Sequence, residues 1–132
     1  MAYFLEFDEQ SRVARLVWEG RVTDEVLLEG SAVGTKFLAS HPGVRGISDF
    51  SKATEFDLSS EVINRLAWAP DQGERGSVVV IVTPQNVAFG LSRMFEMLAE
   101  RDLSKHHSVR TIEEAYKLLG INDAQFVLIS VP

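Results

Sequence analysis

The stretch Arg45–Ala69, R-G-I-S-D-F-S-K-A-T-E-F-D-L-S-S-E-V-I-N-R-L-A-W-A, decides the fold that the sequence predicts. Its first residues, roughly Arg45 to Phe50, are typical of a short buried strand, and Ser51–Glu55 is predicted to be a polar turn. A helix is expected from near Asp57 or Ser59, because Asp and Ser satisfy the first amides of a helix. In α/β domains, a corner of this kind often meets ligands or phosphates. We therefore treat it as the first candidate site.

The segment before this corner predicts two strands and a helix. Tyr3–Asp8 and Arg12–Glu19 both alternate with period two, and the short link between them favours an antiparallel hairpin. Gly20 is interpreted as the end of the second strand. Thr23 suits the N-cap of a helix, and the His-Pro-Gly sequence at residues 41–43 is expected to stop that helix.

Two glycines, Gly30 and Gly34, lie four residues apart in this first predicted helix. In a membrane such a pair would suggest association between helices, but the segment is too polar to be membrane-embedded. Because glycine lets another element approach closely, we expect this helix to pack tightly on the sheet.

The segment Ser77–Thr83 contains V-V-V-I-V, a continuous run that is typical of a strand buried on both faces. Thr83 is predicted to cap a third helix with Pro84 at its first position. The residues predicted to face inward from that helix are Val87, Leu91, Met94, Phe95 and Leu98.

The last part of the chain predicts a strand at His106–Arg110 and a fourth helix. Thr111 and Glu114 fit a capping box at the start of that helix, and Gly120 fits its end. The apolar tail Gln125–Val131 must pair with the sheet, cover a hydrophobic face or join a neighbouring subunit. The sequence thus predicts one α/β domain with a mixed sheet of four or five strands, an N-terminal antiparallel hairpin and about four helices.

Composition narrows the classes of function. The 132 residues carry 13 Lys and Arg against 19 Asp and Glu, so a basic face for nucleic acid is not expected. The chain has no cysteine, which excludes disulfides, thiol catalysis and cysteine-ligated metals. No signal peptide is visible, and no apolar run approaches ~18 residues, the length that spans a membrane. We therefore expect a cytoplasmic protein.

Several short motifs occur together in an order and spacing that resemble a known family. They are G-R-V-T (Gly20–Thr23), I-S-D-F-S (Ile47–Ser51), D-L-S-S-E (Asp57–Glu61), the V-V-V-I-V strand, F-G-L-S-R-M-F (Phe89–Phe95) and E-E-A-Y-K-L-L-G (Glu113–Gly120). In these motifs the chain resembles the STAS superfamily, the fold of anti-sigma-factor antagonists, and more closely its bacterial SpoIIAA-like branch, also labelled STAS/SEC14-domain proteins. The resemblance covers about residues 3–120. It implies a STAS-like domain over residues 1–120. Residues 121–132 are expected to form an apolar tail that packs on this domain or on a neighbouring subunit, as in a homodimer.

The resemblance also implies a non-catalytic regulatory domain without a cofactor. Classical antagonists carry D-S-S-G at the start of this helix, with a serine that a partner kinase phosphorylates. Here Leu58 replaces the first serine, and Glu61 stands near the glycine, where its charge would repel phosphate groups. Asp57, Ser59 and Ser60 are candidates for a phospho-switch or an anion site, and the alternative is simple capping of the helix.

The SEC14 side of the resemblance implies an apolar pocket between helices and sheet. Flexible and aromatic side chains that could border it lie at the end of the second helix and along the third: Trp68, Phe89, Met94, Phe95 and Met97. They are interpreted as a surface for an apolar ligand, a partner or a membrane. The alternative is core packing with a homodimer contact. Arg93 is a candidate contact for an acidic head group, the alternative being a solvated charge.

Other pairs of reactive side chains give no catalytic or metal site. Asp49 and Asp57 could approach each other across the predicted turn, but no nucleophile or third ligand accompanies them. His106 and His107 are neighbours on a strand, so they point to opposite faces and cannot easily share a metal ion. The sequence favours a non-catalytic module that recognises a protein partner or a small ligand at the face of the second and third helices. The alternative is a carrier or sensor of a lipid-like molecule in a SEC14-like pocket, associated with the membrane surface.

Overall fold

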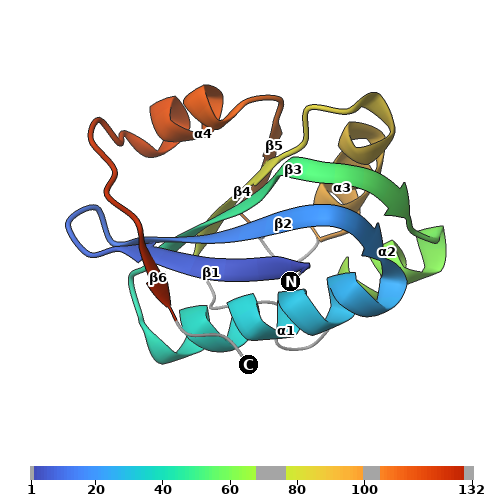
Figure 1. Ribbon diagram of the computed structural model, residues 1–132, viewed down its shortest axis with the longest axis horizontal. Coiled ribbons are helices and arrows are strands. Elements are labelled where there is room, and N and C mark those ends of the chain that lie inside the picture. Colours follow the sequence, from blue (N-terminus) through green and yellow to red (C-terminus); the bar gives the residue numbers. More distant parts are fainter. Residues whose placement is uncertain (1, 68–76, 100–104, 130–132) are drawn as a thin grey trace.

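The computed structural model describes residues 2–67, 77–99 and 105–129 (Figure 1). Within these residues the chain forms six strands and four helices, so the predicted α/β class is confirmed. The elements are β1 Tyr3–Asp8, β2 Val13–Thr23, α1 Asp24–Ser40, β3 Arg45–Asp57, α2 Ser60–Ala67, β4 Val78–Val82, α3 Asn86–Ala99, β5 Lys105–Val109, α4 Ile112–Leu119 and β6 Val127–Ile129.

All the described strands belong to one mixed sheet with the order β5-β4-β3-β2-β1-β6. The hairpin β1–β2 is antiparallel, as predicted, while β2, β3, β4 and β5 are parallel neighbours. The sixth strand, which the expected count of four or five lacked, comes from the apolar tail. Its residues pair antiparallel with β1, with Ile129 opposite Leu5. The sequence left three alternatives for the tail, and its described residues follow the first, which is pairing with the sheet.

The helices cover the two faces of the sheet unequally (Figure 1). The larger core lies between the sheet and α1, α2 and α3, and the smaller one lies under α4. Alternate residues of β4 serve the two cores, because side chains alternate along a strand: Ile81 belongs to the larger, and Val80 and Val82 to the smaller. The prediction that this strand is buried on both faces is confirmed.

Helix α1 packs closely on the sheet at its two glycines. A Cβ atom on Gly30 would lie 2.4 Å from Cη2 of Trp18, which is far inside van der Waals contact. A Cβ on Gly34 would lie 3.4 Å from Cδ2 of Leu16. The sequence-based expectation of close packing is therefore confirmed.

Strand β3 is longer than predicted, and the predicted turn at Ser51–Glu55 is wrong. Residues Gly46–Asp49 pair with β4, whereas the later part of β3 pairs with the far end of β2. Ala53 there is 3% exposed although its neighbours are exposed. The strand β2 likewise continues through Gly20, which adopts a φ of 68° beside a register shift. A bulge of this kind adds an extra residue to one strand, which interrupts the strict alternation of side chains and bends the strand.

The start of α3 also differs from the prediction. The helix begins at Asn86, so Thr83 does not cap it. The helix therefore starts later than predicted, and Val87 is 70% exposed although it was expected to face inward. Ala88 and Ser92 are buried on the inner side together with Phe95.

Three predicted helix ends are confirmed. The hydroxyl of Thr23 accepts a hydrogen bond from the backbone of Val26 at the start of α1. Thr111 and Glu114 form the capping box of α4. Gly120 ends that helix in the left-handed conformation that glycine adopts without strain.

Candidate functional site

The predicted phosphate or anion site is already filled by a side chain of the protein. Ser59 caps α2, since its hydroxyl accepts a hydrogen bond from the backbone N–H of Val62 at 3.1 Å. Its own N–H and hydroxyl donate to the carboxylate of Asp24 at 2.9 and 2.7 Å. An incoming anion would therefore meet a negative charge. The geometry supports the capping alternative.

The other two residues of that candidate site face solvent. Asp57 forms an exposed ion pair with Arg21 at 2.7 Å, and Ser60 is the exposed first residue of α2. Asp49 lies eight residues before Asp57 on the same extended strand, which separates the two by about 26 Å at ~3.3 Å per residue. The hypothesis of a carboxylate pair is therefore wrong.

The side chains predicted to form one apolar surface are dispersed in the structure. The centroid of the Phe89 ring lies 4.2 Å from the guanidinium carbon of Arg110. Met97 is 67% exposed, whereas Met94 packs against the larger core. Of Phe89, Met94, Phe95 and Met97, the predicted residues that the structure describes, only Phe95 lines the cavity described below.

Two further predicted positions do not contribute to a described site. Trp68 lies outside the described residues. Arg93 is exposed and pairs with Glu96 at 3.4 Å, one turn along α3, and it does not line the cavity.

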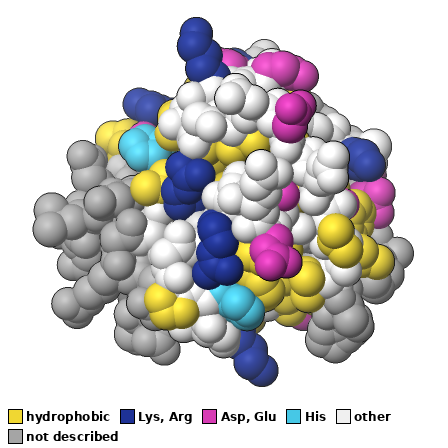
Figure 2. Space-filling model, turned by 90° about the vertical axis from the view of Figure 1, so that its left-hand side faces the viewer, with side chains coloured by type: hydrophobic (Ala, Val, Ile, Leu, Met, Phe, Trp, Pro, Cys, Tyr) yellow, Lys and Arg dark blue, Asp and Glu magenta, His cyan; other side chains and the backbone are white. Residues whose placement is uncertain are grey.

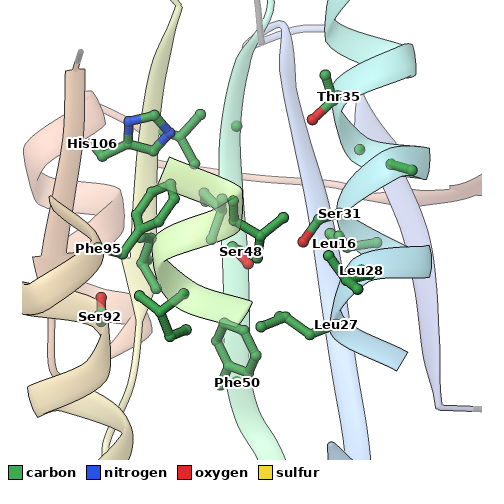
Figure 3. Close-up of a pocket in the computed structure, with 18 of the residues that line it drawn as sticks. Leu16, Leu27, Leu28, Ser31, Thr35, Ser48, Phe50, Ser92, Phe95 and His106 are labelled. Carbon is green, nitrogen blue, oxygen red and sulfur yellow. The ribbon is translucent and has the colours of Figure 1, made fainter. Parts of the chain in front are cut away.

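A large cavity lies between the sheet and the three helices α1, α2 and α3 (Figure 3). Its volume is about 630 Å³, within the range of pockets that hold small molecules. Most of the described side chains that line it are aliphatic or aromatic, including Leu16, Leu27, Phe50, Ile63 and Phe95. Such a lining favours an apolar molecule, because burial against it removes apolar surface from water.

The parallel register of β3, β4 and β5 sets the floor of this cavity. At one end Gly46 and His106 flank Val79 across the sheet. At the other end Phe50 and Thr83 each follow a paired residue of β3 and β4, one position further along. In Figure 3, His106 and Phe50 accordingly stand at opposite ends.

The two ends of the cavity differ in exposure. Among the described lining residues, the exposed ones are Ala32, Lys36 and Ala39; all three belong to α1, which places the opening along this helix. Phe50 and Ala88, at the other end, are 8% and 4% exposed. The cavity therefore has an open side along α1 and a closed end beneath α2 and the start of α3.

Several hydroxyl groups interrupt the apolar lining. Ser31 and Thr35 point from α1 toward the cavity, and Ser48 lies on its floor (Figure 3). The hydroxyl of Ser48 accepts a hydrogen bond from Nε1 of Trp18 at 2.9 Å. Ser92 bonds to a hydroxyl of β5. The cavity can thus offer hydrogen bonds at a few fixed points within an apolar surface.

His106 is a titratable side chain that lines the cavity. Its ring is nearly perpendicular to that of Phe95, with the ring centroids 4.8 Å apart. The pKa of His106 is lowered from 6.5 to about 4, first by burial and then by the neighbouring His107, while Glu96 opposes both. The imidazole is therefore neutral at pH 7. His107 is exposed on the opposite face, as predicted.

Metal ligation finds no support in this part of the chain. In residues 2–67, 77–99 and 105–129, no three His, Asp or Glu side chains gather closely enough to hold an ion.

Within the same ranges, no helix combines the length and hydropathy needed to cross a bilayer. The end of the molecule in Figure 2 shows basic, acidic and hydrophobic side chains interspersed.

Comparisons with known proteins place the chain in no family. No protein-family model matches it, and no curated protein is significantly similar to it. The cavity is therefore the structural feature that bears most directly on function.

Sequence reasoning missed most of the residues that line the cavity. Ser31 and Thr35 lie one turn apart on α1, and they share the sheet-facing side of this helix with Leu27 and Leu38. Polar residues at helical spacing among inward-facing leucines are a signal that could have identified them. Ser92 gives the same signal on α3.

Proposed function

We propose that this chain binds a small, mainly apolar molecule in the cavity between the sheet and α1, α2 and α3. One observation supports this most: a cavity of about 630 Å³ with a largely apolar lining opens along one helix. A closely packed core holds few voids larger than a water molecule, so this volume suits a ligand. The role that fits is that of a non-catalytic carrier or sensor in the cytoplasm.

The resemblance to the STAS/SEC14 proteins agrees with this proposal, since it implies an apolar pocket between helices and sheet. It also suggests association with a membrane surface, where such a ligand would be exchanged. Family membership, like the ligand, stays a proposal.

Recognition of a protein partner on the outer face of α2 and α3 has less support. The exposed apolar residues of α3, Val87 and Met97, are separated by nearly three turns and do not form one patch. A homodimer would use the outer edge of β6, where Val127 and Leu128 are 66% and 63% exposed.

Binding can be tested directly on the purified protein. Titration with the neutral dye N-phenyl-1-naphthylamine, whose fluorescence rises in apolar surroundings, should saturate at one dye per chain. Native mass spectrometry after gentle purification should reveal a copurified apolar molecule that solvent removes.

A matched pair of variants locates the binding. Ser31→Leu places added volume in the cavity and should weaken dye binding at least tenfold. Ser40→Leu makes the same change at an exposed position at the end of α1 and should leave binding unchanged. Equal effects of the two variants, or the absence of saturable binding by the wild type, would contradict the proposal.

A further inference from the structure

Thr83 is a buried residue whose hydroxyl has no hydrogen-bond partner in the described part of the chain. It follows β4 directly and is 2% exposed. Its backbone N–H donates to the carbonyl oxygen of Val109 at 3.0 Å, so the main chain is satisfied. Its hydroxyl oxygen Oγ1 hydrogen bonds to no residue in the described part of the chain. Such a group is unfavourable unless something completes it, because it has lost its hydration.

The side chain of Thr83 belongs to the lining of the cavity, at the closed end. Ala88 and Phe50, both buried, line the same end. Thr83 lies four residues beyond Val79, the residue of β4 that pairs with His106, which corresponds to about 13 Å along the strand. A molecule that touches both ends must therefore be elongated.

Few ionisable side chains line the cavity between its two ends. Among the described residues that line the cavity, the ionisable side chains are Lys36 and His106. Lys36 is exposed on the open side, and His106 stands at the end remote from Thr83. An ionised ligand group at Thr83 would be buried without an opposite charge, which is strongly unfavourable.

We propose that the ligand is an elongated, uncharged amphiphile whose hydroxyl or carbonyl group hydrogen bonds to Thr83 Oγ1 at the closed end. Its apolar part extends along the floor formed by β3 and β4 toward His106. This assignment depends on the proposed function, since it specifies the ligand of the same cavity. The class comprises fatty alcohols, neutral esters and ketones, in contrast to free fatty acids.

The test compares octane, 1-octanol and octanoate as competitors of the bound dye in the wild type and in Thr83→Val. Valine has nearly the shape of threonine but lacks the hydroxyl. The variant should bind 1-octanol about tenfold more weakly, because the alcohol loses its partner, and should bind octane equally well or better. Thr83→Ser restores a hydroxyl and should recover much of the 1-octanol affinity. Thr54→Val, the same change at an exposed position of β3, should alter neither affinity.

The outcomes separate this inference from the proposed function. If the wild type binds neither the dye nor any competitor, the proposed function fails and this assignment with it. If octane and 1-octanol both bind and Thr83→Val changes the two affinities equally, binding in the cavity is supported and the role of Thr83 is contradicted. If octanoate binds as tightly as 1-octanol and loses the same affinity in Thr83→Val, the assignment of an uncharged ligand is contradicted.

Discussion

The carboxylate of Asp24, the first residue of α1, accepts hydrogen bonds from both the backbone N–H and the hydroxyl of Ser59, the N-cap of α2. The two residues lie 35 positions apart in sequence. The bond joins the starts of two helices that both border the cavity. A corner that resembles a regulatory motif therefore acts here as a structural tie.

These hydrogen bonds predict that alanine variants of two adjacent serines differ clearly in their free energy of unfolding. Ser59→Ala removes the cap of α2 and leaves Asp24 without one partner, so the free energy of unfolding should fall by about 1 to 2 kcal/mol. Ser60→Ala, at an exposed position with no such bond, should stay within about 0.5 kcal/mol of the wild type. Urea denaturation followed by circular dichroism measures both. Equal stabilities of the two variants would contradict the assigned cap.

Two glycines in helices should respond to alanine with opposite signs. Gly30→Ala forces a methyl group against Trp18 at 2.4 Å, and overpacking of this kind lowers the free energy of unfolding by about 1 to 3 kcal/mol. Gly90→Ala in α3 meets nothing within 4 Å and should raise it by about 0.5 to 1 kcal/mol, since alanine favours helices. Thermal unfolding of the two variants beside the wild type gives the signs. A neutral Gly30→Ala would show that α1 does not pack on Trp18.

Acid should destabilise the protein through His106. Its pKa in the folded state is about 4, below the ordinary 6.5, so between these values the unfolded chain takes up a proton that the folded chain does not. Stability is therefore lost as the pH falls from about 6.5 to 4, by roughly 3 kcal/mol in all. Below pH 4 this contribution no longer changes.

The measurement compares denaturation at a series of pH values for the wild type and His106→Gln. Carboxylates titrate in both proteins, so the difference between the two profiles isolates the histidine. His107→Gln, at the exposed neighbouring position, is the control: it removes only the smaller of the two effects that lower the pKa of His106, so most of the wild-type pH dependence should remain. Parallel profiles for the wild type and His106→Gln would refute the buried, neutral state of His106.

Most of the secondary structure follows from local sequence signals. Thr23, Thr111 and Gly120 mark helix ends by chemistry that acts within a few residues, and all three predictions are confirmed. The polar run Ser51–Glu55 misled the prediction because its strand character comes from pairing with the end of β2, far away in sequence. Local periodicity carries no information about such a partner or about the bulge at Gly20.

The cavity was harder to predict, because it is a property of several elements together. Ser31 lies on α1, Ser48 lies on β3 and Thr83 directly follows β4, so both the packing of the helix on the sheet and the register of the strands bring them to one cavity. Thr83 in particular has the sequence of a helix cap, followed by proline, yet α3 begins three residues later. A hydroxyl without a partner is visible only once the surrounding atoms are placed.

The tail provides a final prediction. Phe126 packs against the guanidinium of Arg15 at 4.4 Å and near Tyr116, and β6 covers the edge of β1. Removing residues 124–132 should lower the free energy of unfolding by about 2 kcal/mol or more, since a large ring and a strand pairing are lost. It also uncovers the backbone of β1, so the truncated chain should associate as its concentration rises. Light scattering after size exclusion, over a range of concentrations, measures the association. A truncated chain that kept the stability and mass of the full chain would show that β6 does not protect this edge.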